Sequence, residues 1–513
     1  MGNYILTVDQ GTTSTRCMIF DKAGNSLGSG QQEFEQYYPN PGWVDHDPEE
    51  IFASVVSALR KALEKSGIEP AQIEAIGITN QRETTVVWNK ENGRPIHPAI
   101  VWQCRRTAPI CEMWKENGWE KIVLERTGLV IDAYFSATKI KWILDGVPGA
   151  MQDARDGKLL FGTIDSWLVY KLTGGRSHVT DYSNASRTMI FNTDKLCWDE
   201  ELCDMFGIPM SMLPRALPSC SNFGEIEAGI PGLEKLAGIQ ITGIAGDQAA
   251  ALFGQMCIEE GDVKNTYGTG CFTLMNTGRK RVISENGLLS SVAWSFQGNT
   301  VYALEGSVFH AGSIISWLKD EMHMISEPRE CDELAESVSD SGGVYLVPAF
   351  SGLGAPYWDM YARGCIVGLT RGSGRAHIAR AAIESIAFQV YDLIELMKRD
   401  SGYDIRSIKV DGGVSVSNLL MQIQADLIGV PVDRSLERET TSQGVAFMAG
   451  LTAGIWENID DVQKLRRSDR IFLPGISRSD IQERIKCWRK AVSKASSWAS
   501  TDCEKQTEGM DKE

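Results

Sequence analysis

Two short units of strand, polar turn and strand begin the two halves of this chain. In residues 4–20, two apolar runs flank the polar stretch 9–14. Residues 262–275 repeat this arrangement around the turn Gly268-Thr269-Gly270. Apolar runs separated by a turn-forming cluster are typical of a β-hairpin. The recurrence indicates a weak internal duplication, and it limits the chain to folds in which each half starts with paired strands.

Helices and strands alternate along both halves. Residues 48–65 carry Ile51, Val55 and Leu59 at the spacing of an amphipathic helix, and Ser66-Gly67 provides the stop. Further predicted elements are strands at 73–78, 84–88 and 407–410 and helices at 377–399 and 418–428. Interleaving of this kind predicts the α/β class, with layers of helices on sheets.

The chain is longer than one hydrophobic core usually supports. Its 513 residues predict two large domains. A new strand pattern begins between residues 254 and 262, so we place the domains at 1–256 and 257–513, with a polar tail from about residue 500. A binding site between the two domains is the corresponding expectation.

Charge and composition exclude several classes of partner. The formal net charge is −16, which repels nucleic acid and anionic lipid. No apolar run approaches the ~20 residues of a membrane helix. The 12 cysteines form no Cys-x-x-Cys pair, and no charged-then-apolar leader precedes the first strand. We therefore expect a cytoplasmic protein that neither binds nucleic acid nor inserts into a membrane.

The first polar turn has the composition of a phosphate-binding loop. Thr12, Thr13 and Ser14 offer hydroxyl and backbone N–H groups that can surround phosphate oxygens, and Arg16 adds a permanent charge. Asp9, at the end of the preceding strand, can hold Mg²⁺ through water. The alternative, an ordinary hairpin turn, is the commoner structure for such residues.

Two further turns are candidates for contact with the same polyphosphate. Gly268-Thr269-Gly270 and Asp411-Gly412-Gly413 each follow a predicted strand, and their glycines allow close approach of the backbone to a nucleotide. Hairpin tips from two halves can close on one polyphosphate, as in ATPases of the actin and sugar-kinase type. P-loop, Rossmann and protein-kinase motifs are absent, and the 6 histidines lack the spacing of zinc ligands.

Arg82 and Glu83 place opposite charges side by side between two predicted strands. A polyol requires donors and acceptors together. Arg82 can donate to its hydroxyl oxygens, Glu83 can accept its hydroxyl protons, and Trp102 can cover its carbon side. A salt-bridged turn at the surface explains these residues equally well.

Asp247 stands between the apolar segment 239–244 and the small-residue run 249–251. A carboxylate at such a junction of strand and helix commonly serves as an N-cap. It can also act as a general base that takes the proton of a hydroxyl group during phosphoryl transfer. The position of Asp247 alone is compatible with both roles.

Together these segments resemble the FGGY family of carbohydrate kinases. The resemblance extends from Val8 to about Gly475. Its highly specific stretches include residues 77–85 (GITNQRETT), 100–107 (IVWQCRRT) and 264–272 (KNTYGTGCF), and residues 364–384 resemble the family's second signature.

The resemblance implies two actin-like, ribonuclease H-like ATPase domains of the α/β class with a cleft between them. The implied reaction is phosphorylation of glycerol by Mg²⁺-ATP to sn-glycerol 3-phosphate, with Asp247 as general base and Arg16 neutralising charge in the transition state. By position, the residues expected to bind the polyol are Arg82, Glu83, Trp102, Tyr134, Asp247, Gln248 and Phe272. Those expected at the phosphates and nucleotide are Thr12, Thr13, Ser14, Arg16, Thr269, Gly312, Ser316, Gly413 and Ser417. Asp9 and Asp247 are the expected metal ligands.

Two positions depart from the family pattern. Ser316 and Ser417 stand where relatives often have glutamine and asparagine near the nucleotide, so we expect a purine contact to be lost or replaced by water. A homodimer or homotetramer is the expected assembly. The rival functions are a kinase of another polyol or sugar, such as xylulose, and an actin-like or Hsp70-like ATPase, which needs no polyol pocket.

Overall fold

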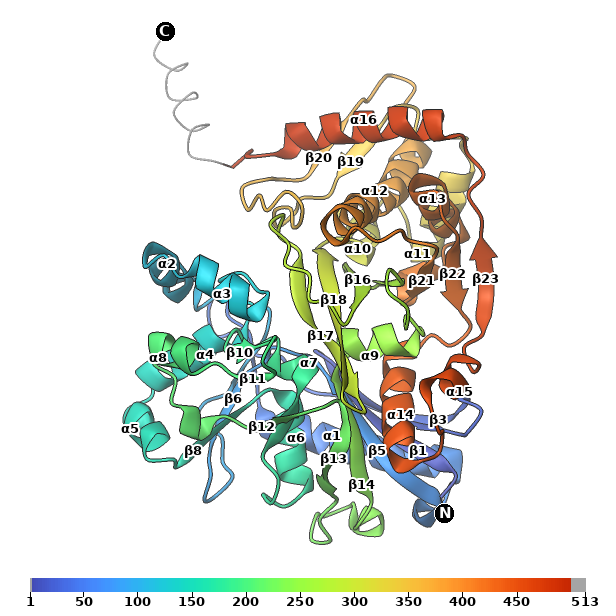
Figure 1. Ribbon diagram of the computed structural model, residues 1–513. Coiled ribbons are helices and arrows are strands. Elements are labelled where there is room, and N and C mark those ends of the chain that lie inside the picture. The colour runs from blue at the N-terminus through green and yellow to red at the C-terminus, as the bar shows by residue number, and fades with distance from the viewer. Residues whose placement is uncertain (1, 500–513) are drawn as a thin grey trace.

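The computed structural model describes residues 2–499, and each half of the chain contains one large mixed sheet (Figure 1). The predicted polar tail from about residue 500 lies outside the described residues. Helices lie between the two sheets and on their outer sides. The arrangement is that of the predicted α/β class.

The first sheet has six strands in the order β13-β14-β5-β1-β2-β3. Its strands are β1 (Tyr4–Gln10), β2 (Ser14–Phe20), β3 (Ser26–Glu33), β5 (Ile73–Asn80), β13 (Cys220–Glu225) and β14 (Gln240–Gly246). β1 and β2 form the first predicted hairpin, and their register pairs Asp9 with Arg16. β1, β5 and β14 run parallel, so their carboxyl ends lie at one edge of the sheet.

The second sheet has seven strands in the order β17-β18-β16-β15-β21-β22-β23. Its strands are β15 (Val263–Tyr267), β16 (Cys271–Gly278), β17 (Leu289–Phe296), β18 (Asn299–Val308), β21 (Ile408–Asp411), β22 (Val432–Ser435) and β23 (Ser468–Phe472). β15 and β16 form the second predicted hairpin. β15, β21 and β22 run parallel.

The two sheets share one topology. In the first, β3, β2 and β1 are antiparallel neighbours and are followed by β5 and β14 in parallel. In the second, β18, β16 and β15 are antiparallel and are followed by β21 and β22 in parallel. The shared order agrees with the internal duplication that the two hairpins predicted.

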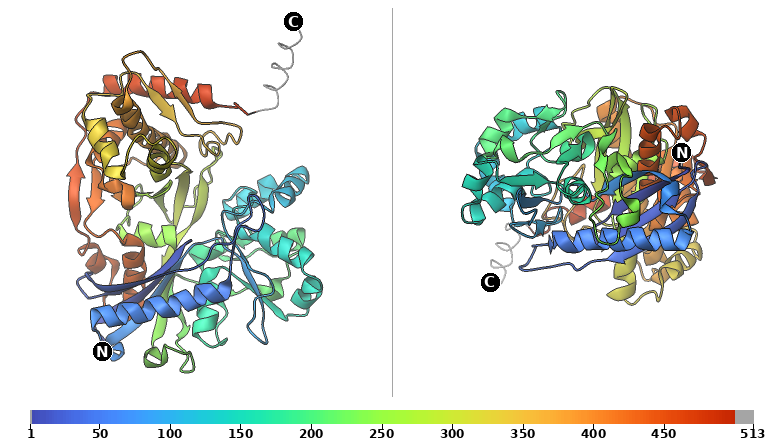
Figure 2. Two further views of the ribbon diagram at one scale, coloured as in Figure 1. Left: turned by 180° about the vertical axis from the view of Figure 1, so that it is seen from behind. Right: turned by 90° about the horizontal axis from the view of Figure 1, so that it is seen from below.

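Helices α1 (Pro48–Ser66) and α6 (Ile164–Leu172) cover the outer face of the first sheet. Asp47 caps α1 by accepting a hydrogen bond from the backbone N–H of Glu49, and Gly67 ends the helix with a φ of 67°. Seen from behind, α1 lies across the strands of this sheet (Figure 2). The helix therefore shields the outer side of the sheet that carries the first hairpin.

A helix from the far end of the chain, α14 (Thr440–Ala453), covers the inner face of the first sheet. In β1, Leu6 faces the α1 side, whereas Ile5 packs with Ala449 of α14. Thr242 Oγ1 of β14 also donates to the carbonyl of Ala449 at 2.9 Å. The second half of the chain thus completes the core of the first.

α14 packs against α9 (Asp247–Gly254), and the two helices form a layer between the sheets (Figure 1). Glycines lie at their crossing. A Cβ atom on Gly444 would collide with the carbonyl oxygen of Ala250, and one on Gly254 with that of Thr440. The close crossing therefore requires glycine, and it places the N-terminus of α9 where the two halves meet.

The outer face of the second sheet is covered by α12 and α13. The remaining elements of this half, in chain order, are α10 (Gly312–Asp320), α11 (Pro328–Glu336), β19 (Tyr345–Val347), β20 (Cys365–Val367), α12 (Arg375–Ser401), α13 (Asn418–Ile428), α15 (Ile459–Gln463) and α16 (Arg478–Ala495). The predicted helices at 377–399 and 418–428 are thus confirmed as α12 and α13. Within the described residues, none of the helices is both long and apolar enough to cross a bilayer.

A lobe of short elements is inserted between β5 and β13 (Figure 1). Besides α6, its elements are β6 (Val86–Asn89), β7 (Ala99–Ile100), α2 (Ala108–Glu116), α3 (Glu120–Thr127), α4 (Ser136–Gly146), α5 (Ala150–Arg155), β8 (Leu159–Gly162), β9 (Val179–Asp181), α7 (Tyr182–Ala185), β10 (Phe191–Asn192), β11 (Cys197–Trp198), α8 (Glu200–Phe206) and β12 (Arg215–Leu217). β7 pairs with β4 (Asp45–His46). The lobe has its own apolar cluster, in which Trp114 stacks on Phe206 at 3.9 Å between ring centroids. It therefore provides a packed support for Trp102 and Tyr134.

Candidate active site

Two adjacent parallel strands end at the candidate site. Arg82 and Glu83 follow β5, and Asp247 follows β14 as the first residue of α9. Neighbouring parallel strands end at the same edge of a sheet, so charged side chains from distant parts of the chain meet there. Arg82 Nε lies 3.2 Å from Asp247 Oδ1 and 3.7 Å from Glu83 Oε1.

The Asp247 side chain does not cap its helix. The N-cap residue is Gly246, and Asp247 Oδ1 accepts the backbone N–H of Gln248 at 2.7 Å. The N-cap interpretation of Asp247 is therefore wrong, and its side chain remains 34% exposed. Burial raises the pKa of Asp247, the charge of Arg82 opposes this shift, and the charge of Glu83 adds to it. A reachable carboxylate of raised pKa suits a general base.

Arg82 lies in a buried ion-pair network. Its Nη1 and Nη2 donate to Oε2 and Oε1 of Glu305 at 2.5 and 2.8 Å, and Nη2 also donates to Tyr134 Oη at 3.3 Å. Arg82 and Glu83 are only 5% and 1% exposed, so the interpretation as a surface turn is wrong. The two-pronged contact with Glu305 fixes the plane of the guanidinium group.

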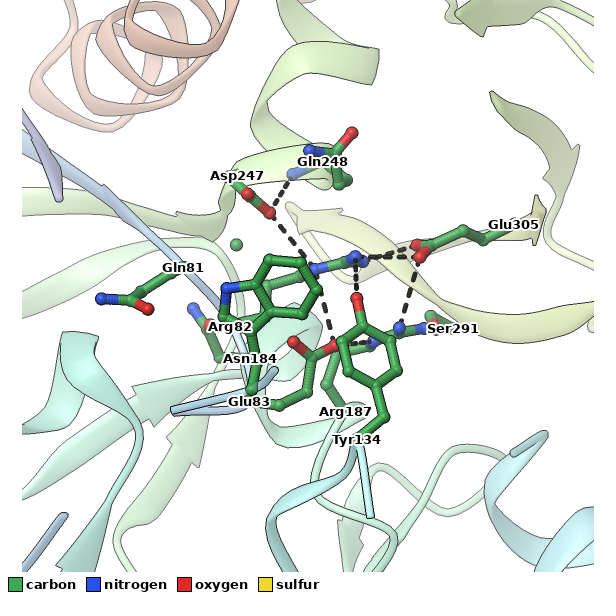
Figure 3. A network of polar contacts seen from close by, with 12 residues as sticks. Gln81, Arg82, Glu83, Tyr134, Asn184, Arg187, Asp247, Gln248, Ser291 and Glu305 are labelled. Carbon is green, nitrogen blue, oxygen red and sulfur yellow. Dashed lines mark hydrogen bonds and ion pairs between the residues drawn. The ribbon is translucent and has the colours of Figure 1, made fainter. Parts of the chain in front are cut away.

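A second arginine, Arg187, completes the network, as Figure 3 shows. Its Nε donates to Glu83 Oε1 at 2.7 Å, its Nη1 to Ser291 Oγ at 3.0 Å, and its Nη2 to Glu305 Oε1 at 3.3 Å. Burial alone would raise the pKa of Glu305. The charges of Arg187 and Arg82 and the hydrogen bond from Arg82 outweigh burial and lower this pKa to about 2. Glu305 is therefore a permanent anion in the network.

Trp102 and Tyr134 of the inserted lobe lie beside the network with their ring centroids 5.5 Å apart. Trp102 Nε1 donates to Thr12 Oγ1 at 3.0 Å. Tyr134 is tied to Arg82 through its hydroxyl group. Aromatic rings with one polar atom engaged can cover the carbon side of a polyol while their position stays fixed.

Gln248 of α9 and Phe272 of the second sheet complete the expected set of polyol residues. Gln248 Oε1 accepts a hydrogen bond from Nζ of the buried Lys264 on β15. Phe272 lies on β16 and packs against the apolar cluster that contains Ala249 of α9. Polar and ring contacts thus join six of the seven expected polyol residues, whereas Phe272 reaches the site through apolar packing.

Arg16 on the first hairpin is already paired. It forms an ion pair with Glu439, the residue before α14, and donates to Gln31 Oε1 at 3.0 Å. Ser14 Oγ accepts from Gln31 Nε2 at 3.0 Å, and Thr13 is exposed at the tip. The guanidinium group of Arg16, which was expected at the phosphates, therefore lies beside the carboxylate of Glu439 from the second half.

The pair Asp9 and Asp247 fits a divalent cation. Burial and the charge of Asp247 raise the pKa of Asp9 to about 7, against a hydrogen bond from Ser442 and the charge of Arg16. A cation beside the two carboxylates would relieve this unfavourable charge. Within residues 2–499, no three His, Cys, Asp or Glu side chains gather into a site that could hold a metal. Water and phosphate would therefore complete the coordination of Mg²⁺.

The glycine turns of the second sheet form one continuous backbone surface. The backbone N–H of Gly312, the first residue of α10, donates to the carbonyl of Gly268 at 2.9 Å. Gly412 has a φ of 87°, and a Cβ atom there would collide with the backbone of Tyr267. The turn around Thr269, the start of α10 and the turn before η4 (Gly413–Val416) therefore adjoin.

The two positions that depart from the family pattern lie on helices beside this surface. Ser316 is part of α10. Ser417 caps α13, where its Oγ accepts the backbone N–H of Leu420 at 3.1 Å and donates to Asp332 of α11. The Ser417 hydroxyl group is therefore engaged within the protein.

Sequence reasoning missed Glu305 and Arg187. Glu305 follows the apolar residues 301–304, and Arg187 precedes the segment 188–191, which is also largely apolar. A charged residue in a segment that is otherwise typical of a core needs a partner of opposite sign. Applying this rule could have identified both residues, although not their partners.

Comparison with known proteins identifies the class of protein. The model of the N-terminal domain of the FGGY family of carbohydrate kinases matches residues 4–254, and that of the C-terminal domain matches residues 263–453. The chain belongs to the FGGY family of carbohydrate kinases.

Individual relatives are more specific. The chain is 54% identical to Glycerol kinase 2 of Thermotoga maritima over 495 residues, 96% of this chain and 99% of the relative. It is also 54% identical to the glycerol kinase of Symbiobacterium thermophilum over 497 residues, 97% and 99% of the two chains. The crystal structure of Plasmodium falciparum glycerol kinase with ADP matches with a TM-score of 0.91 and 37% identity, covering 96% of this chain and 98% of that one. The predicted fold, with two actin-like α/β domains, is thereby confirmed.

Proposed function

We propose that this protein transfers the γ-phosphoryl group of ATP to glycerol and releases sn-glycerol 3-phosphate and ADP. The observation that carries the proposal is the pair of Asp247 and Arg82, in which a reachable carboxylate of raised pKa lies 3.2 Å from a buried arginine. The relatives named as glycerol kinases, which match nearly the whole chain, support glycerol as the acceptor.

Glycerol binds at the carboxyl ends of β5 and β14. Its hydroxyl groups meet Arg82, Glu83, Tyr134, Asp247 and Gln248, and its carbons lie against Trp102 and Phe272. The mixture of charged donors, charged acceptors and aromatic rings in a small space supports this assignment, because a short polyol presents hydroxyl groups on every carbon.

In the transfer step, a bond forms between a terminal hydroxyl oxygen of glycerol and the γ-phosphorus, and the bond from that phosphorus to the β,γ-bridging oxygen breaks. Asp247 takes the hydroxyl proton. The transition state is loose, so alignment of the hydroxyl group and neutralisation of the spreading charge by Arg16 supply most of the catalysis. Asp9 and Asp247 would hold Mg²⁺, which would supply positive charge against the phosphate oxygens of ATP.

ATP lies between the tip of the first hairpin and the glycine turns of the second sheet. Thr12, Thr13 and Ser14 contact the phosphates from the first domain, residues 1–256. The second domain, residues 257–513, holds the nucleotide through Thr269, Gly312, Ser316, Gly413 and Ser417. The ADP named with the Plasmodium falciparum structure supports an adenine nucleotide. Location in the cytoplasm and assembly as a homodimer or homotetramer belong to the same proposal.

The test is a coupled assay of ADP release with glycerol, dihydroxyacetone, erythritol and xylulose as acceptors. We expect glycerol to give the highest kcat/KM. Strong turnover of xylulose with none of glycerol would overturn the choice of substrate. ADP release at an equal rate without any acceptor would favour an actin-like ATPase instead. An Asp247→Asn preparation, purified in parallel, controls for contaminating kinases.

A further inference from the structure

Two residues hold Arg82 and Glu83 on the side away from Asp247. We propose that Glu305 and Arg187 are positioning residues of the polyol site, and that the second sheet, through Glu305, fixes the geometry with which the first domain binds its substrate. This inference rests on the proposed function, because it takes glycerol as the ligand whose binding the two residues control.

Glu305 determines where the Arg82 guanidinium group lies. Both terminal nitrogens of Arg82 donate to its carboxylate, at 2.5 and 2.8 Å, while Nε remains directed at Asp247 at 3.2 Å. A planar guanidinium group that is held at two nitrogens cannot rotate about its long axis. Without Glu305, Arg82 would be a long side chain with one ion-pair partner fewer and several rotamers.

Arg187 has the same relation to Glu83. Its Nε donates to Glu83 Oε1 at 2.7 Å, and its own position is fixed by Ser291 and Glu305. The guanidinium group also lies over the rings of Tyr134 and Phe135, at 5.4 and 5.2 Å from their centroids. The hydrogen bond from Arg187 to one oxygen of Glu83 thereby orients the Glu83 carboxylate.

The residues of this network come from both halves of the chain. Glu305 lies on β18 and Ser291 on β17, the two strands at one edge of the second sheet, whereas Arg82 and Arg187 belong to the first half (Figure 3). The polyol residues of the first domain are therefore oriented by strands of the second. Their geometry depends on how the two domains sit against each other.

The buried part of the network is balanced in charge, and the partly exposed Asp247 pairs with Arg82 at its edge. Two arginines face two glutamates, and all four residues are nearly fully buried. Removal of one member leaves an uncompensated buried charge, which destabilises a fold whether or not the residue positions a ligand. A test must therefore separate stability from substrate affinity.

The first variant is Glu305→Gln, which keeps the size of the side chain and removes its charge. We expect the KM for glycerol to rise roughly 10- to 100-fold, as for outer partners that orient a ligand-binding group, and the KM for ATP to change less than about twofold. Direct titration of glycerol in a calorimeter, without nucleotide, should give the same increase in Kd. Glu305→Asp, which keeps the charge, should restore part of the affinity.

Glu384→Gln is the matched control. Glu384 is a buried glutamate on α12 that also faces two arginines, Arg380 at 2.8 Å and Arg484 at 2.9 Å. Its loss should lower Tm without changing either KM. A similar increase in the KM for glycerol in this variant would show that general destabilisation explains the Glu305→Gln result, and the proposal would be wrong.

The double variant Arg187→Gln/Glu305→Gln is decisive if Glu305→Gln alone does not fold. It restores the charge balance, so Tm should recover while the KM for glycerol stays at least about tenfold above that of the unaltered protein. Recovery of both quantities, or an unchanged KM for glycerol in Glu305→Gln, overturns the positioning role. Failure of the unaltered protein to phosphorylate glycerol would instead overturn the proposed function itself.

Discussion

The indole N–H of Trp102 donates to the Thr12 hydroxyl oxygen at 3.0 Å. This bond joins the aromatic wall of the proposed polyol pocket to the tip of the phosphate hairpin. The two residues lie on different elements, one in the inserted lobe and one between β1 and β2. A displacement of the hairpin tip is therefore transmitted to the ring that covers the polyol.

This bond predicts non-additive effects of substitution. Thr12→Val removes it with almost no change of shape, and Trp102→Phe removes it while keeping an aromatic ring. We expect each to lower kcat/KM for glycerol about tenfold and the double variant to be only slightly worse, because a lost hydrogen bond cannot be lost twice. A double-mutant cycle on kcat/KM measures this coupling. Strictly multiplicative losses would show that the contact does not link the two sites.

Asp247→Asn tests the general base directly. The substitution keeps the hydrogen bond from the backbone N–H of Gln248 but removes the proton acceptor. We expect kcat to fall roughly 10²- to 10⁴-fold, with Tm nearly unchanged and glycerol binding retained in a calorimetric titration. A variant that keeps most of its kcat would exclude Asp247 from this role.

Glu439→Gln tests whether Arg16 is shared between a carboxylate and the phosphates. The two side chains are about a third exposed, so loss of the pair should cost less than about 1 kcal/mol of stability. Because the full charge of Arg16 then becomes available, we expect the KM for ATP to fall about two- to fivefold at low salt. The gain should disappear at high salt. Weaker ATP binding at low salt would show that Glu439 holds Arg16 in place for the phosphates.

His46 predicts a pH dependence of stability. Burial lowers its pKa from 6.5 to about 4. Its Nε2 lies 2.7 Å from Gln36 Oε1, an acceptor, so the proton is on Nε2, and Nδ1 accepts from the Gln81 amide at 3.4 Å. The neutral ring contributes its full stability above pH 6.5, and this contribution is lost as the pH falls through about 4.

Between these limits, the unfolded chain binds one proton more than the native protein at this site, which gives a slope of about 1.4 kcal/mol per pH unit. In urea unfolding at pH 6.5, 5.5 and 4.5, the slope of stability against pH should be smaller in His46→Gln than in the unaltered protein by about 1.4 kcal/mol per pH unit, because other shifted groups, such as His178 and Asp9, contribute equally to both. Substitution of the exposed His323 by Asn serves as the control. Equal slopes in His46→Gln and the unaltered protein would contradict the assignment.

Local patterns predicted much of the fold. Both hairpins, α1 and α12 follow from apolar spacing and turn residues, because these signals act over a few neighbouring positions. The role of α14 as a layer between the sheets did not follow. This helix is apolar on nearly all sides, so its sequence gives no direction of burial, and its packing depends on strands far away in the chain.

In the candidate site, too, contacts between distant segments could not be predicted from local sequence. The resemblance to a family located Arg82, Glu83 and Asp247, and the structure brings them together. Glu305 and Arg187 carry no motif, and their pairing with Arg82 and Glu83 depends on how two sheets come together in space. Ion pairs between residues far apart in the sequence form only in the tertiary structure, and the spacing of residues along the chain does not predict them.

Because α14 covers the inner face of the first sheet, the first domain cannot complete its core early in synthesis on the ribosome. β14, the last of the parallel strands of this sheet, ends at Gly246, whereas α14 begins only at Thr440. A nascent chain therefore pairs its first strands while Ile5 and its apolar neighbours still lack their partners on α14. The first sheet can therefore pack against α14 only after almost the whole polypeptide has been synthesised.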